Sequence, residues 1–288
     1  MLEIMLEVLP PQRRAPSDAI RQSAEKIKAS VDALDAVRFL NVPEITEENY
    51  IGVPLYKHHD ARDFGALLRD TTKCNVVVNK VTVYLKSEEE FSSWLSDSID
   101  KHGIRYFVFV GGNSHTRKYP GPQVIRANEI ASANGKVHVG NICIPTRVNE
   151  PARLLAKTRS GVSFFTTQLL FESGSFKKVV GEYAGLCEDE GLKPSSFFVS
   201  LAPVTSGVDM DFFKWLGALI PPDVESNFSK SGDMGAFSVK LASGIFYDIN
   251  HFMLENGIKI KVSPNIEAIS NANLGAACEI AKSILAKG

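Results

Sequence analysis

Short apolar runs alternate with longer amphipathic segments along the whole chain. The apolar runs predict strands at 2–9, 36–42, 75–84, 104–110, 137–142, 163–168, 196–201 and 259–262. The intervening segments predict helices near 17–34, 60–70, 88–102, 122–133, 147–160, 174–190 and 268–286, and two more helices within 209–254, split by Pro221 and Pro222. Polar and apolar positions do not alternate strictly in the run 104–110, which is typical of a strand buried on both faces.

This alternation predicts the fold class. Eight strands, each followed by a helical segment, indicate an α/β protein with a single (β/α)8 TIM barrel that covers residues 1–288 as one domain. The main alternative is a doubly wound sheet, but no strand is followed by a G-x-G-x-x-G turn. Because a barrel carries its active site at the carboxyl ends of its strands, the residues that follow each strand are the candidates for chemistry.

The composition argues against several classes of protein, namely nucleic-acid-binding, membrane, disulfide-rich and metal-binding proteins. The 32 basic and 33 acidic residues nearly cancel, so neither nucleic acid nor an anionic membrane is expected as a partner. The sequence has no run of about 18 apolar residues and no basic segment before its first apolar run, so we expect no membrane-spanning helix and no signal peptide. The four cysteines lack the spacing of a disulfide framework or a zinc site, and the adjacent His58 and His59 would not share a helix face. The sequence predicts a reduced, cytoplasmic enzyme without a metal.

Glu7 is the first candidate, near the end of the first strand. It stands in an apolar run that Pro10 and Pro11 close. Burying an ionised carboxylate costs free energy unless the group is paired or protonated. The alternative, a strand-end carboxylate that faces water, stays open.

Amides and glycines follow other predicted strands. Gly111 and Gly112, ahead of Asn113, would let a ligand approach the backbone closely, although a plain turn would use the same glycines. Gln168 ends an apolar strand, where its amide either contacts a ligand or caps the structure. Asn141 and Asn265 are the corresponding polar residues at the fifth and eighth strands.

The order of these pieces resembles the methylenetetrahydrofolate reductases. The opening Glu7-Val8-Leu9-Pro10-Pro11 is similar to that family's E-F-F-P-P, and the segment 159–172, with Thr167-Gln168 inside it, is similar to A-G-A-x-F-x-I-T-Q-x-x-F-D. Gly111-Gly112-Asn113 stands in the place of R-G-D, and 220–222 in the place of an I-P segment. The resemblance covers nearly the whole chain and implies the same barrel.

The resemblance also implies roles for single residues. Glu7 matches the family's general acid, which protonates a folate nitrogen so that the ring opens to an iminium ion that accepts a hydride. Gln168 matches the glutamine that contacts the pterin and the nicotinamide. Asn113, in the place of the family's aspartate, would bind substrate; Asn265 is expected to bind substrate from its position after the last predicted strand and not from the resemblance. The expected cofactor-binding residues are Gly111, Gly112, Asn141 and Lys157, of which Lys157 matches a flavin-contacting lysine.

Most positions that hold FAD in flavin-containing members are changed. Gly111 and Asn113 replace an arginine and an aspartate, and the segment 140–145 lacks the family's tyrosine and histidine. We therefore expect no tightly bound FAD. The chain is more similar to flavin-independent reductases, in which NADH or NADPH passes hydride directly to the methylene group of a reduced folate or a related pterin. The alternative is a non-reducing pterin-binding barrel, either an accessory subunit or a methyltransferase of C1 metabolism. A homo-oligomer and a subunit of a complex both stay open.

Overall fold

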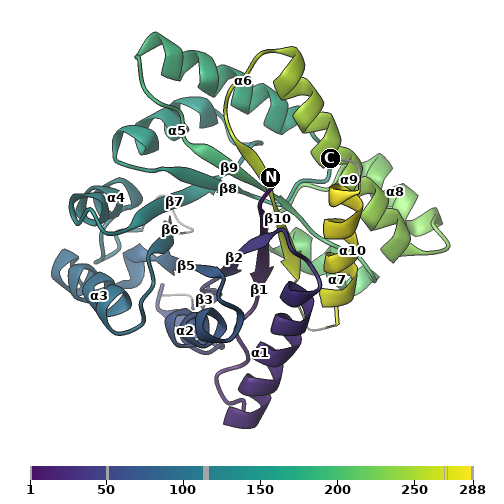
Figure 1. The fold of residues 1–288 in the computed structure, drawn as a ribbon. Coiled ribbons are helices and arrows are strands. Elements are labelled where there is room, and N and C mark those ends of the chain that lie inside the picture. The colour runs from purple at the N-terminus through teal and green to yellow at the C-terminus, as the bar shows by residue number, and fades with distance from the viewer. Residues whose placement is uncertain (1, 50–51, 113–116, 269, 271, 287–288) are drawn as a thin grey trace.

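The computed structural model describes residues 2–49, 52–112, 117–268, 270 and 272–286. Eight parallel strands close into a barrel, in the order β1-β10-β9-β8-β7-β6-β5-β2, and helices surround it (Figure 1). The barrel strands are β1 (Ile4–Val8), β2 (Val37–Val42), β5 (Asn75–Val81), β6 (Tyr106–Val110), β7 (His138–Cys143), β8 (Phe164–Thr167), β9 (Ser196–Leu201) and β10 (Val262–Ala268). The predicted single (β/α)8 TIM barrel is confirmed.

Ten α-helices are found in the described part of the chain. They are α1 (Ser17–Asp32), α2 (Ala61–Thr72), α3 (Glu88–Asp100), α4 (Val124–Ala133), α5 (Glu150–Arg159), α6 (Gly174–Asp189), α7 (Gly207–Trp215), α8 (Pro222–Lys230), α9 (Met234–Glu255) and α10 (Leu274–Leu285). The prediction of two helices within 209–254 was wrong, because a third helix, α9, begins after Asp233. The Asp233 side chain accepts a hydrogen bond from the Ala236 amide and so caps a new helix. None of the described helices is long and apolar enough to cross a membrane.

Two small elements lie in the loops at the carboxyl end of the barrel. After β2 the chain forms an antiparallel hairpin of β3 (Thr46–Glu48) and β4 (Pro54–Tyr56). A 3-10 turn, η1 (Thr82–Tyr84), replaces the last part of the strand predicted at 75–84. Both elements bring side chains to the carboxyl mouth of the barrel.

The last strand differs from its prediction. We expected it at 259–262, but β10 begins at Val262 and continues to Ala268, through Pro264. Proline cannot donate to a strand ladder, so the pattern reading ended the strand too early. The pairing with β9 nevertheless continues, with Pro264 opposite Val199 and Asn265 opposite Ser200. As a result Asn265 is a residue within strand β10, and not a loop residue after the last strand as we expected.

The barrel interior has an apolar layer and a polar layer. Met5, Val77, Val108, Phe164 and Phe198 pack together in the apolar layer. Successive side chains of a strand face opposite sides, so the residues two positions further along also face inward. Those of β1, β5, β8 and β9 are polar, whereas Val110 of β6 is apolar. These inward polar residues are Glu7, Asn79, Thr166 and Ser200, joined by Asn41 and Asn265 from β2 and β10. Barrel interiors are ordinarily filled by branched apolar side chains, so this polar layer marks the carboxyl half of the barrel as a candidate site.

Candidate functional site

Glu7 projects from β1 into this polar layer. Its Oε2 atom accepts hydrogen bonds from Asn41 Nδ2 at 2.5 Å and from Asn265 Nδ2 at 3.2 Å. Burial raises the pKa of Glu7 from 4.5 to about 7, although the two amide donors act in the opposite direction. Glu7 is therefore a carboxyl group that exchanges its proton near neutral pH.

A second carboxyl group, Glu267, lies beside Glu7. The two residues are direct partners in the pairing of β1 with β10. Burial, and then the charge of Glu7, raise the pKa of Glu267 well above its usual range, against a hydrogen bond with Ser200. The sequence analysis missed Glu267, because the predicted strand stopped before Pro264. The polar period-two positions Ser263, Asn265 and Glu267 were the signal that could have found it.

Both carboxyl groups line a cavity of about 260 Å³, which we call the Glu7 cavity. Gly111 forms part of its wall, and Gly112 lies against the Tyr119 ring. The other lining residues come from the ends of β5 and β6, from the loops around the mouth and from α7; they include Leu9, Pro43, Tyr84, Phe212 and Trp215.

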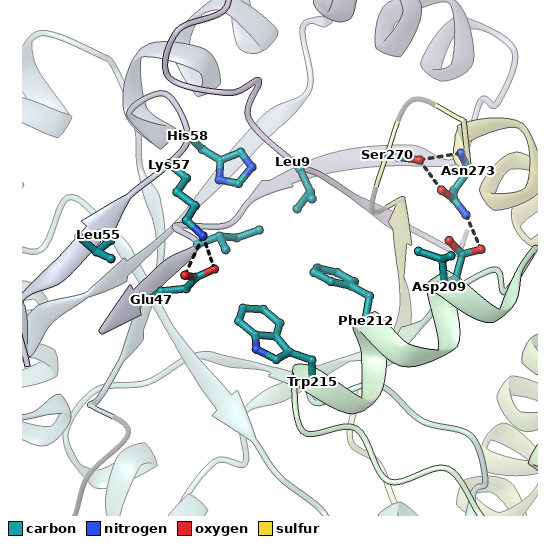
Figure 2. Close-up of a pocket in the computed structure, with 12 residues that line it drawn as sticks. Leu9, Glu47, Leu55, Lys57, His58, Asp209, Phe212, Trp215, Ser270 and Asn273 are labelled. Carbon is teal, nitrogen blue, oxygen red and sulfur yellow. Dashed lines mark hydrogen bonds and ion pairs between the residues drawn. The ribbon is translucent and has the colours of Figure 1, made fainter. Parts of the chain in front are cut away.

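Figure 2 shows a larger cavity of about 510 Å³, which we call the Trp215 cavity. Leu9, Ile45, Phe212 and Trp215 line both cavities. Phe212 and Trp215 project from α7, with ring centroids 5.8 Å apart and an interplanar angle of 23°. Across the cavity, Lys57 Nζ forms an ion pair with Glu47 at 2.7 Å. The stacked rings give the mouth a flat apolar wall, which suits a planar ligand.

Four buried oxygen atoms of the polar layer have no hydrogen-bond partner among the described residues. They are Asn41 Oδ1, Asn79 Oδ1, Thr166 Oγ1 and Asn265 Oδ1. Buried polar groups without a partner usually mark a site for water or a ligand. The carbonyl oxygens accept hydrogen bonds, so they complement the N–H groups of a heterocycle. No group of three or more histidine, cysteine, aspartate or glutamate side chains that could hold a metal occurs among the described residues.

Gln168 lies at the same end of the barrel as Glu7, after β8, but two strands separate β8 from β1. Its Nε2 atom donates to the Leu216 carbonyl at 3.4 Å. Gln168 is not among the described residues that line the Glu7 cavity, whereas Leu216 is. The amide thus contacts the end of α7 and does not itself reach the Glu7 cavity.

Asn141 and Lys157 serve the fold. Asn141 is within β7, fully buried, and exchanges two hydrogen bonds with Asn128 of α4, at 2.9 and 3.0 Å. Lys157 donates to the Ile142 carbonyl at 2.6 Å, and burial lowers its pKa. Neither side chain lines either cavity among the described residues, so their predicted cofactor contacts have no support in their positions. Asn113, the remaining predicted site residue, lies outside the described residues.

Comparisons with known proteins extend the fold assignment. No protein-family model and no curated protein matches the sequence. Among solved structures, the chain is similar to an uncharacterized protein from Clostridium thermocellum described as binding two copies of 5-methyl-5,6,7,8-tetrahydrofolic acid. The TM-score is 0.80 at 22% sequence identity, over 99% of this chain and 95% of that chain. At this identity the similarity shows that the two proteins share a fold.

Proposed function

We propose that this barrel binds a reduced folate, or a related pterin C1 carrier, and reduces its methylene group with hydride from NADH or NADPH. In this reaction 5,10-methylenetetrahydrofolate becomes 5-methyltetrahydrofolate. The Clostridium thermocellum protein of the same fold binds a 5-methyl-tetrahydrofolic acid, which supports the ligand class. The motif resemblance around Glu7 and Gln168 supports the reaction class.

The observation that carries the proposal is the position of the Glu7 carboxyl group, which lines the cavity and is held by two amide donors. Opening the methylene bridge requires a proton on the ring nitrogen that leaves the C1 unit. A general acid works best when its pKa lies near the working pH, and Glu7 has a pKa of about 7 in a partly closed cavity. Asn41 and Asn265 hold its carboxyl group in one orientation.

The other residues of the mouth bind and orient. Asn41 and Asn265 line neither cavity among the described residues and act by holding the Glu7 carboxyl group, whereas the wall of Phe212 and Trp215 would keep water from a flat ring. Bound nicotinamide supplies the hydride. A flavin has no part in the proposal, since Asn141 and Lys157 are engaged inside the fold.

A second candidate function is a pterin-binding barrel that does not reduce its ligand, such as an accessory subunit or a methyltransferase. One observation favours it. Gln168, which would contact pterin and nicotinamide together, is not among the described residues that line the Glu7 cavity.

Purified protein incubated with 5,10-methylenetetrahydrofolate and either NADH or NADPH separates the two functions. We expect oxidation of a nucleotide and formation of the 5-methyl product. Glu7→Gln should keep folate affinity within a few fold and reduce turnover by about 10²–10⁴-fold, because the proton donor is lost. Glu188→Gln, an exposed change on α6, is the matched control and should leave turnover unchanged.

Two outcomes contradict this proposal. Folate binding without oxidation of either nucleotide would favour the non-reducing barrel. Turnover of Glu7→Gln within a few fold of the parent would remove Glu7 from the role of acid.

A further inference from the structure

The two carboxyl groups of the Glu7 cavity cannot ionise independently. Glu7 and Glu267 face the same cavity from adjacent strands, at paired positions. Two neighbouring carboxylates in a poorly hydrated site repel each other, so the pair loses its protons in two separate steps.

Hydrogen bonding decides which carboxyl group ionises first. Glu7 Oε2 accepts two amide N–H groups, from Asn41 and Asn265. An N–H group can only donate, so both bonds favour the carboxylate form of Glu7. Glu267 has the Ser200 hydroxyl as its partner, and Ser200 Oγ also accepts from Asn265 Nδ2 at 2.9 Å. Glu7 is therefore better stabilised as an anion than Glu267.

The other ionisable groups of the cavity do not reverse this order. Glu44 accepts from Lys80 Nζ at 2.7 Å, and Tyr84 donates to Glu48 Oε1 at 2.6 Å. No lysine, arginine or histidine is among the described residues that line the Glu7 cavity. Thus no cation at this cavity wall stabilises Glu267 as an anion.

We propose that Glu267 is the proton reserve of the site: it stays protonated when Glu7 has ionised, and it returns a proton to Glu7 during the reaction. This inference rests on the proposed function for the identity of the proton acceptor. Glu267 acts through Glu7 and is therefore a positioning residue.

Each proton transfer breaks one O–H bond and forms one new bond to hydrogen. The O–H bond of Glu7 breaks, an N–H bond forms on the folate nitrogen, and the bond from that nitrogen to the C1 unit opens. Hydride from the nicotinamide then reduces the resulting cation. The O–H bond of Glu267 breaks as one forms on Glu7, and water at the mouth restores the proton of Glu267.

The titration of the two groups agrees with this order. The pKa of Glu7 is raised to about 7, whereas burial and the charge of Glu7 raise the pKa of Glu267 well above its usual range. A reserve of this kind gives Glu7 a short path by which it regains its proton after each turnover.

Infrared spectroscopy of the ligand-free protein tests where the proton resides. At pH 8 we expect the carbonyl stretch of a protonated carboxyl group in the parent protein and its loss in Glu267→Gln. As the pH is raised, the band should disappear at a lower pH in Glu7→Gln than in the parent, because the charge of Glu7 no longer holds the proton on Glu267. Absence of the band from the parent at pH 8, or its survival in Glu267→Gln, would overturn the proposal.

The pH profile of turnover tests the relay. Glu267→Gln should stay close to the parent near pH 6, where water returns protons to Glu7 readily, and should lose more of its turnover at pH 8, where Glu7 regains its proton slowly without Glu267. An equal loss at both pH values would indicate a merely structural role and would overturn the relay. If the infrared result holds but neither nucleotide is oxidised, the reductase function fails while the proton on Glu267 stands.

Discussion

At the scale of single residues, Asn141 shows how an amide at a predicted strand end can be bound within the fold and not exposed to a ligand. Its amide and that of Asn128 form a closed pair, and both residues are fully buried. Asn128 also donates to Ser160 Oγ at 2.9 Å, which ties α4 to the end of α5. Sequence position alone placed Asn141 at the barrel mouth, but its side chain points from β7 toward the helices.

We predict that Asn141→Ala destabilises the protein by about 1–3 kcal/mol, because the Asn128 amide loses its partner in a buried site. The free energy of unfolding from urea denaturation measures the effect. Asn134→Ala, an exposed change at the end of α4, is the control and should stay within about 0.5 kcal/mol of the parent. The double variant Asn128→Ala with Asn141→Ala should cost less than the sum of the two single changes. Unchanged stability together with lost nucleotide affinity would restore Asn141 to the cofactor site.

The sequence predicted part of the site at this scale. Glu7 could be found because burying a carboxylate in an apolar strand costs free energy unless the group is paired, protonated or at a solvent-accessible site. Asn265 was also selected and lies against Glu7, although it is a strand residue and not the loop residue we expected. The polar period of the last strand could have revealed Glu267 itself but not its place beside Glu7, since that depends on the register of two strands from opposite ends of the chain. Register between distant strands is set by the closed barrel and not by local pattern.

At the scale of elements, β7 shows how one missing side chain shapes the barrel interior. Gly140 faces inward from β7, and a Cβ atom built there would lie 2.4 Å from Phe164 Cζ. The Phe164 ring is buried and packs edge-on against Phe198 at 6.0 Å. The glycine therefore leaves room for an aromatic ring in the apolar layer below Glu7.

We predict that Gly140→Ala destabilises the protein by about 1–3 kcal/mol, because the added Cβ atom would overlap the Phe164 ring and force the ring to shift. Gly244→Ala on α9, where no atom lies within 4 Å of the added Cβ, should instead be neutral or stabilise by up to about 1 kcal/mol. Thermal unfolding of the two variants gives the comparison. An equal change in unfolding temperature for both variants would show that the Phe164 ring can shift at little cost in free energy.

The elements also show where local pattern fails. Seven of the eight strands were predicted within a few residues of their observed positions, because strands buried on both faces form continuous apolar runs. The last strand lies further along the chain than predicted, because Pro264 interrupts the apolar pattern, although β10 stays paired with the neighbouring β1 and β9. The hairpin of β3 and β4 was not predicted; its partly exposed residues carry no strong period.

At the scale of the whole molecule, closure of the barrel and assembly of the site are the same event. β1 and β10 come from opposite ends of the sequence and pair with each other, and this pairing sets Glu7 beside Glu267. The two carboxyl groups therefore become neighbours only when the barrel closes. Their electrostatic cost falls on the folded state and is absent from the unfolded chain, which links the site to global stability.

This link gives a pH dependence with a definite sign. The pKa of Glu7 is about 7 in the folded state against 4.5 ordinarily, so the folded protein binds more protons than the unfolded chain between these values, and stability falls as pH rises through them. A shift of this size corresponds to about 3 kcal/mol. Other carboxyl groups with lowered pKa values act oppositely, so the difference between the parent and Glu7→Gln is the informative quantity. Urea unfolding at pH 4.5 and pH 8 should show Glu7→Gln gaining about 3 kcal/mol on the parent at the higher pH. A difference independent of pH would mean that Glu7 is ionised in the folded barrel throughout this range, and the proton donor would then have to be sought elsewhere in the site.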